Sequence, residues 1–159
     1  MRFSDYIVPE AIIPNAKATN MQGIIRETSQ ALVDAGAIPA AEYERVVKYL
    51  LKREELGTTG IGNGIAIPET RLPDLGCVVV SLAISKDGVD FDTLDGEKVQ
   101  LFFTTIATSG DAGSFLRMVE HLTRRLKNEM LVASLKTATT REAIIALLDQ
   151  DDCMLAQCG

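Results

Sequence analysis

The stretch GTTGIGNGIAIPETR, residues 57–71, holds the most specific pattern in this 159-residue chain. Four glycines precede the dipeptide Pro68-Glu69. Glycine adopts positive φ angles and lets the backbone approach a neighbour or a ligand closely. The pattern therefore predicts either a tight turn that feeds a short strand or a loop that presents Glu69 beside a binding site.

The segment Gly60-Ile61-Gly62-Asn63-Gly64 does not meet the requirements of the common nucleotide-binding loops. A dinucleotide fingerprint needs a third glycine three positions after its second, where Ile65 stands. A Walker A loop ends in Gly-Lys-Ser/Thr, whereas Gly64 is followed by Ile65-Ala66. Neither kind of nucleotide site is predicted here.

The longer segment KREELGTTGIGNGIAIPETR, residues 52–71, closely resembles the signature of enzyme IIA domains of the phosphoenolpyruvate-dependent phosphotransferase system, fructose/mannitol type. That family includes nitrogen-regulatory relatives, and VDFDTLDGEKVQLFF (89–103) resembles its stretch before the third helix. The signature is met by Arg53, Glu54, Thr58, Thr59, Gly60, Gly62, Gly64, Ala66 and Pro68. The resemblance implies an α/β fold: a mixed β-sheet of about five strands flanked by helices on both faces.

The resemblance also implies a phosphotransfer site, but two of its positions are changed. In the family a histidine after the proline accepts a phosphoryl group from HPr or its nitrogen-branch counterpart, because a neutral imidazole nitrogen is nucleophilic near pH 7. Glu69 stands there, and Phe115 stands where a second histidine supports the first. A remnant of the anion site would comprise Arg53, Thr58, Thr59, Gly60, Gly62, Gly64 and Glu69.

Three roles for Glu69 are compatible with this pattern. It is a fixed negative charge beside Arg53, partly imitating a phosphorylated histidine. Alternatively, it forms an acyl phosphate, although no second carboxylate near Pro68-Glu69-Thr70 is available to recruit Mg²⁺. In the third interpretation Glu69 is a solvated loop residue of a decayed site. Thr58 and Thr59 are hydroxyl donors to an anion or, more commonly, caps of the turn backbone.

The chain contains one histidine, His121, in a segment expected to be helical. Any phosphohistidine would have to form there. The helical spacing predicts a solvated His121 on a polar face, away from the stripe of Phe115, Val119, Leu122 and Leu126. A basic strip of Arg117, His121, Arg124 and Arg125 is a second hypothesis, as a docking surface for an acidic partner.

Composition restricts the class of protein. The formal net charge is −6, which argues against a nucleic-acid partner or a membrane-surface partner. No apolar run reaches the length of a signal peptide or a membrane span, so we expect a cytoplasmic protein. The three cysteines, Cys77, Cys153 and Cys158, are expected to be reduced thiols, and no metal or other cofactor is predicted.

Hydrophobic periodicity predicts alternating strands and helices in one domain, residues 1–150, with a tail at 151–159. The expected strands are 11–15, with Pro14 marking an edge strand, then 77–85, 89–91 and 98–108. The apolar run 77–85 is typical of a strand covered on both faces.

Helices are expected to begin at a capping box with Thr19 as N-cap, at Pro39, at Ser114, and at a second capping box from Thr139 to Glu142. The first is expected to end at Gly36. The third is expected to run without a break to about Ser134, with Met130 in its apolar stripe.

Together these features predict an enzyme IIA-like protein of the nitrogen-regulatory type, acting through protein contacts and unable to accept phosphate at residue 69. The alternative is an active phosphocarrier that uses Glu69 or His121, so whether the chain is an enzyme stays open. The partner implied by the resemblance is an HPr-type carrier or a regulated enzyme or transporter.

Overall fold

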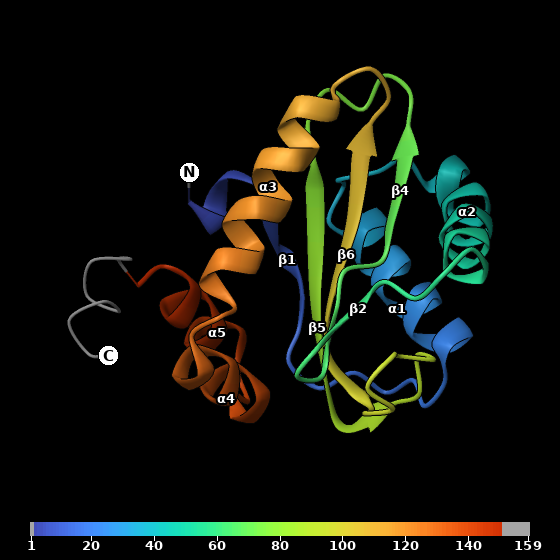
Figure 1. Cartoon of the computed structure of the whole chain (residues 1–159). Helices are drawn as coiled ribbons and strands as arrows, with labels where there is room; N and C mark the ends of the chain where they lie inside the picture. Colours follow the sequence, from blue (N-terminus) through green and yellow to red (C-terminus); the bar gives the residue numbers. More distant parts are fainter. Residues whose placement is uncertain (1, 151–159) are drawn as a thin grey trace.

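The computed structural model describes residues 2–150. Short 3₁₀ turns, η1 (Phe3–Asp5) and η2 (Ala40–Glu42), accompany the regular elements. The strands are β1 (Ile7–Ile13), β2 (Gly60–Gly62), β3 (Ile65–Ala66), β4 (Glu69–Leu72), β5 (Val79–Val89) and β6 (Val99–Thr108). The helices are α1 (Met21–Asp34), α2 (Tyr43–Glu55), α3 (Ala112–Arg125), α4 (Glu129–Thr137) and α5 (Arg141–Leu148). Figure 1 shows these helices on both sides of the sheet.

The six strands form one mixed sheet. Its order is β1-β5-β6-β3-β2, and β4 also pairs with β6. The β5–β6 and β2–β3 pairs are antiparallel, whereas β1–β5, β3–β6 and β4–β6 are parallel. The expected mixed α/β sheet is therefore confirmed, with six strands in place of about five.

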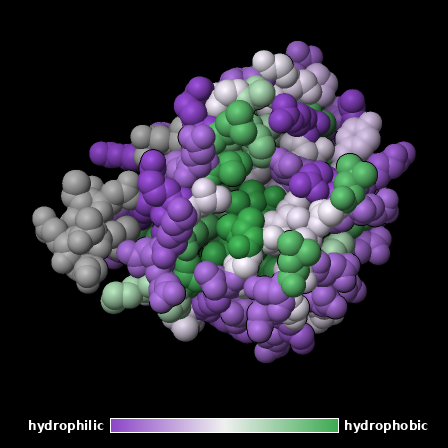
Figure 2. Space-filling model, in the orientation of Figure 1, coloured by the Kyte–Doolittle hydropathy of each residue, from purple (hydrophilic) through white to green (hydrophobic). Residues whose placement is uncertain are grey.

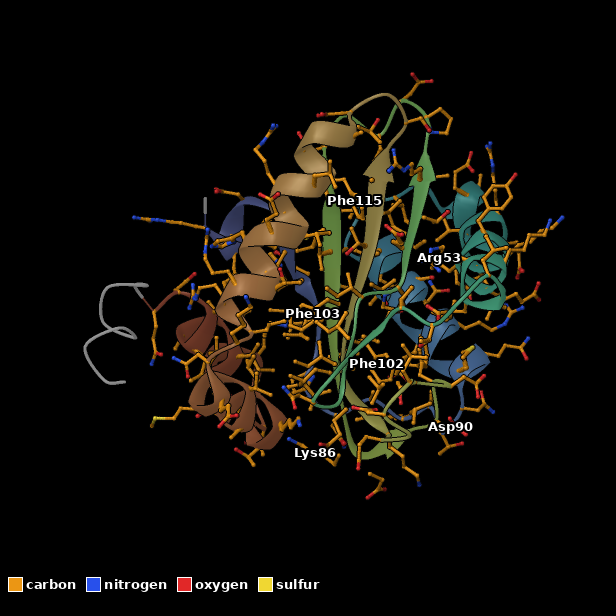
Figure 3. All side chains as sticks on the ribbon, viewed as in Figure 1. Arg53, Lys86, Asp90, Phe102, Phe103 and Phe115 are labelled. Atoms are coloured by element: carbon orange, nitrogen blue, oxygen red, sulfur yellow. The ribbon has the colours of Figure 1, made fainter. Side chains whose placement is uncertain are left out.

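Two hydrophobic cores lie on the two faces of the sheet. Consecutive residues of β6 point to opposite faces, so Phe103 packs in the core beneath α3, α4 and α5 while Phe102 packs in the core beneath α1 and α2 (Figure 3). Both rings are fully buried. The apolar run of β5 is likewise buried from Val79 to Ser85, as expected for a strand covered on both faces.

Residue 69 is positioned by a continuous register along β6. Ile65 pairs with Leu101 in β3, and Glu69 pairs with Thr105 in β4. The difference in residue number between partners is the same in both pairs, so β3 and β4 continue one parallel pairing with β6. The pairing is interrupted at Pro68, which lacks an N–H. Because alternate residues share a face, Glu69 lies on the same face as Ile65 and Ile67, which pack in the α3-side core.

Two expected strands differ from the observed ones. The first begins at Ile7, four residues before the expected position, and it is an edge strand as Pro14 indicated. The segment 89–91 is not a separate strand: Val89 is the last residue of β5, and Asp90-Phe91 begins the loop to β6. Phe91 is buried in this loop, where its ring contacts that of Phe102, so its apolar character does not require a strand.

Both expected capping boxes are wrong by one residue. The N-cap of α1 is Asn20, whose Oδ1 accepts from the Gly23 N–H at 2.7 Å, and that of α5 is Thr140, whose Oγ1 accepts from the Ala143 N–H at 3.1 Å. Adjacent Thr-Asn and Thr-Thr pairs each offer two capping side chains, and spacing does not decide between them. Gly36 follows the end of α1 with a φ of 75°, as expected.

The long helix expected from Ser114 to about Ser134 is two helices. Its apolar spacing continues across a break after Arg125, where Asn128 starts α4 by accepting from the Leu131 N–H at 3.0 Å. Met130 is 69% exposed and lies outside the apolar stripe. A side-chain cap thus overrides a periodicity that fits one helix.

Residues 151–159, including Cys153 and Cys158, lie outside the described residues. Cys77 is exposed and carries a free thiol. Within residues 2–150, every helix is too short or too polar to cross a lipid bilayer.

We expect Asn20→Ala to lower the free energy of unfolding by about 1 kcal/mol, because it removes the side-chain acceptor at the first turn of α1. Thr19→Ala is the matched control, since the exposed Thr19 does not cap the helix. Urea denaturation of both variants measures the difference. Equal losses in the two variants would contradict the observed cap.

Candidate functional site

The signature segment forms one wall of an open hollow of about 270 Å³ on the α3 side of the sheet. The opposite wall is a face of α3. The lining residues are Arg53, Thr58, Thr59, Gly60, Ile61, Ile67, Glu69, Phe115, Val119 and Thr123. We call this space the Arg53–Glu69 hollow. Figure 3 shows Arg53 on the α2 side of β4 and Phe115 beside α3.

Of the three roles considered for Glu69, the structure shows the one in which it pairs with Arg53. Arg53 Nε donates to Glu69 Oε1 at 3.2 Å, and Arg53 Nη1 donates to the Gly57 carbonyl at 2.8 Å. The two side chains are 36% and 27% exposed. A partly exposed pair of this kind contributes about 0–1 kcal/mol to stability, so its main effect is local: it fixes the guanidinium against the carboxylate.

The buried carboxylate of Glu54 holds the Thr59 part of the wall through hydrogen bonds. Glu54 accepts a hydrogen bond from the Thr59 N–H at 3.1 Å and another from the Thr59 hydroxyl, and its side chain is almost fully buried. Burial raises the pKa of the Glu54 carboxyl above its ordinary value, and the two bonds from Thr59 and the charge of Arg53 oppose that rise. Glu54 belongs to the signature, but sequence reasoning gave it no part in the site.

Thr58 holds the same turn on its other side. Its hydroxyl donates to the Phe91 carbonyl at 2.8 Å and accepts from the Gly60 N–H at 3.0 Å. Gly60 has a steric role, because a Cβ there would lie 2.5 Å from Thr93 Cγ2. The two threonine hydroxyls therefore bind the turn to α2 and to the loop after β5, and the Gly60 N–H is used within the turn.

Two of the predicted site residues do not reach the hollow. Gly62 has a φ of 97° and faces Asp95, and Gly64 has a φ of 75° beside Lys136. Both belong to the tight β2–β3 hairpin, where their positive φ angles explain the glycines. The structure thus brings together Arg53, Thr58, Thr59, Gly60, Glu69 and Phe115 and separates Gly62 and Gly64 from them.

The α3 wall is apolar where the resemblance implied a second histidine. Phe115, Val119 and Thr123 follow one another at four-residue spacing and line the hollow together. The guanidinium of Arg71, from β4, lies 5.4 Å from the centroid of the Phe115 ring. Sequence reasoning placed Val119 in the helix core and missed Thr123 and Arg71. Figure 2 shows an apolar patch beside α3 on this face, bordered by polar residues.

The prediction of a solvated His121 is wrong. His121 is 3% exposed, its Nδ1 lies 2.7 Å from the Tyr6 hydroxyl, and its ring packs 5.1 Å from that of Phe3. Arg125 is also buried, with its guanidinium 4.8 Å from the centroid of Phe3. The predicted basic strip therefore keeps only Arg117 and Arg124 at the surface. The N-terminal turn η1 and Tyr6 cover this side of α3, a contact that helical spacing cannot reveal.

A family model described as "Phosphoenolpyruvate-dependent sugar phosphotransferase system, EIIA 2" matches residues 5–151. The chain is 30% identical over 148 residues to a nitrogen regulatory protein of Bradyrhizobium diazoefficiens, a match that covers 93% of this chain and 95% of that protein.

Two solved structures share the fold. The nitrogen regulatory protein IIA-Ntr of Neisseria meningitidis matches with a TM-score of 0.80 and 24% identity, covering 89% of this chain and 95% of that one. Enzyme IIAMtl of Escherichia coli, solved in a complex with phosphorylated enzyme IIBMtl, matches with a TM-score of 0.70 and 23% identity, covering 87% and 94%.

Replacing Glu54 by glutamine should remove a pH dependence of stability. Because the pKa of Glu54 is raised, the native protein binds more protons than the unfolded chain as pH rises from about 4, so this group lowers stability toward neutral pH. Glutamine can still accept from the Thr59 N–H. The Tm of Glu54→Gln minus that of the wild type should be near zero at pH about 4 and positive at pH about 7.

If removing the buried charge raises the free energy of unfolding by about 1 kcal/mol, the Tm of a chain of this length rises by about 2–4 °C. Glu55→Gln removes the same charge from an exposed neighbour and serves as the control. A Tm difference that stays flat between these pH values would contradict the role assigned to the buried Glu54 carboxyl.

Proposed function

Because the chain belongs to the EIIA 2 family of the phosphoenolpyruvate-dependent sugar phosphotransferase system, we propose that it acts through protein contacts and does not carry phosphate on residue 69. It is an enzyme IIA-like protein of the nitrogen-regulatory type. In this proposal residues 1–150 act as one domain in the cytoplasm.

The Arg53–Glu69 pair is the observation that carries the proposal. A carboxylate has no ring nitrogen and cannot form a phosphoramidate, and two donors of Arg53 are already bonded to Glu69 and to Gly57. Glu69 brings a charge of about −1 where a phosphoryl group would bring about −1.5 to −2. The site therefore holds a permanent, partial equivalent of the phosphorylated state.

The two alternative acceptors are both disfavoured. His121 is buried against Tyr6 and Phe3, whereas transfer from a carrier protein needs an acceptor that the carrier can approach in line. An acyl phosphate on Glu69 would need activation, usually by Mg²⁺ held between carboxylates. The neighbouring carboxylate of Glu54 has both oxygens bonded to Thr59.

A protein partner suits the hollow. Its walls carry the apolar side chains Ile61, Ile67, Phe115 and Val119, and Ile61 is 48% exposed. Apolar side chains surrounded by polar ones are typical of protein-binding surfaces. The related enzyme IIAMtl forms a complex with a protein, phosphorylated enzyme IIBMtl. The partner of this chain is accordingly an HPr-type carrier or a regulated enzyme or transporter.

We expect no phosphoryl transfer to the wild-type protein. Incubation with labelled phosphoenolpyruvate, enzyme I and an HPr-type carrier should leave no more label on the wild type than on Glu69→Ala. The double variant Glu69→His/Phe115→His should gain up to one phosphoryl group per chain, because it supplies both imidazoles in an otherwise retained site. Glu69→His alone tests whether Phe115 blocks the acceptor.

Stoichiometric label on the wild-type chain would refute the proposal. Acid-labile label that persists in Glu69→Ala would assign the acceptor to His121, and hydroxylamine-labile label that disappears in Glu69→Ala would assign it to Glu69. A histidine-bearing family member, labelled in parallel, confirms that the donor chain is active.

A further inference from the structure

The outer side of α2 carries a second surface, separate from the hollow. Figure 1 shows α2 at the margin of the molecule, and no other described element covers its outer side. Five residues share this side at helical spacing and form what we call the α2 stripe: Arg45, Lys48, Tyr49, Lys52 and Leu56. The stripe is about 16 Å long at the rise of an α-helix.

The charge of the α2 stripe is positive, although the chain carries a net charge of −6. Two acidic residues at its N-terminal end are engaged: Glu42 pairs with Arg45, and Glu44 pairs with Arg26 of α1, each at 3.4 Å. Within residues 2–150, Lys48 and Lys52 form no salt bridge. The stripe thus presents two exposed ammonium groups one turn apart, and among the described residues the exposed Glu55 beside its C-terminal end also forms no salt bridge.

The same stripe exposes apolar area. Leu56 is 86% exposed at the C-terminal end of α2, and Tyr49 is 38% exposed with the Arg45 guanidinium 5.7 Å from its ring centroid. The core beneath α2 is made by Val46, Val47 and Leu50 on its opposite side. Tyr49 and Leu56 are not part of that core, and their alignment with Lys48 and Lys52 gives the stripe both charge and exposed apolar area.

We propose that the α2 stripe docks an acidic, amphipathic segment of a partner protein. Carboxylates one turn apart would pair with Lys48 and Lys52, and an apolar side chain of the segment would pack on Tyr49 and Leu56. Three cationic side chains are fewer than the 6–10 phosphate contacts typical of DNA-binding proteins and fewer than the 4–8 of a polybasic membrane anchor. Charge complementarity thus favours an acidic protein segment over nucleic acid or membrane.

This surface replaces the strip that helical spacing suggested on α3. In α3 the burial of His121 and Arg125 breaks the basic strip, whereas the α2 residues are exposed over three turns. The α2 stripe also lies outside the hollow, and its charge reversal leaves Glu69 and Phe115 unchanged. Failure of the docking proposal would therefore leave the proposal about residue 69 intact, and failure of the proposal about residue 69 would leave the docking proposal intact.

The experiment uses a fluorescein-labelled helical peptide of glutamate and leucine, with the charges four residues apart, and its lysine–leucine counterpart as the charge-inverted control. Fluorescence anisotropy should show binding of the acidic peptide alone, weakening as salt screens the charges. Lys48→Glu/Lys52→Glu should weaken binding about tenfold or more, because two attractions become repulsions. Leu56→Ser should weaken it without changing the salt dependence.

Arg117→Glu/Arg124→Glu is the matched control, since it makes the same change of charge at exposed positions of α3 and should alter affinity less than about twofold. Equal weakening by the two pairs would overturn the proposal, as would tighter binding to a DNA duplex or to phosphatidylserine vesicles. Amide chemical shifts of the wild-type protein give an independent readout: they must change on α2 when the peptide binds, and changes confined to the hollow would also overturn it.

Discussion

The site depends on one constraint of the sheet: the chain from Ile65 to Leu72 runs beside β6 in a single register. That register puts residue 69 on the α3 face, at the point where the ladder resumes after the interruption at Pro68. The last turn of α2 brings Arg53 to the same point, and Glu54, one residue further, ties the glycine-rich turn to α2 through Thr59. A change of residue 69 therefore changes the chemistry of the hollow without changing its construction.

Under the proposed function, this independence of the scaffold from residue 69 lets the chain keep the family fold without carrying phosphate on that residue. A histidine at position 69 would present a nucleophilic nitrogen to the hollow, whereas Glu69 presents an anion that occupies Arg53. Phe115 is the second altered position of the site. Its aromatic ring, packed beneath Arg71, offers no hydrogen bond to an imidazole at position 69. The apolar lining still suits a protein partner, and α2 adds a basic surface outside it.

The elements predicted correctly are those set by local chemistry, such as the doubly buried β5 and the end of α1 at Gly36. The signature offered the Arg53–Glu69 pair as one of three roles for Glu69, and the sequence alone did not decide among them; the structure shows the pair. What local pattern could not predict was set by distant contacts or by competing caps. Tyr6 buries His121 from 115 residues away, and Asn128 divides a helix whose periodicity continues. Gly62 and Gly64 were assigned to the anion site on the family signature, whereas their positive φ angles serve the β2–β3 hairpin.

The central claim is that Glu69 occupies the Nε donor of Arg53. The most direct measurement is the Arg53 Nε–H resonance of ¹⁵N-labelled protein during titration with inorganic phosphate, compared between the wild type and Glu69→Ala. The resonance should stay fixed in the wild type and move saturably in Glu69→Ala, where the guanidinium is released. A saturable movement of equal size in the wild type would contradict the account.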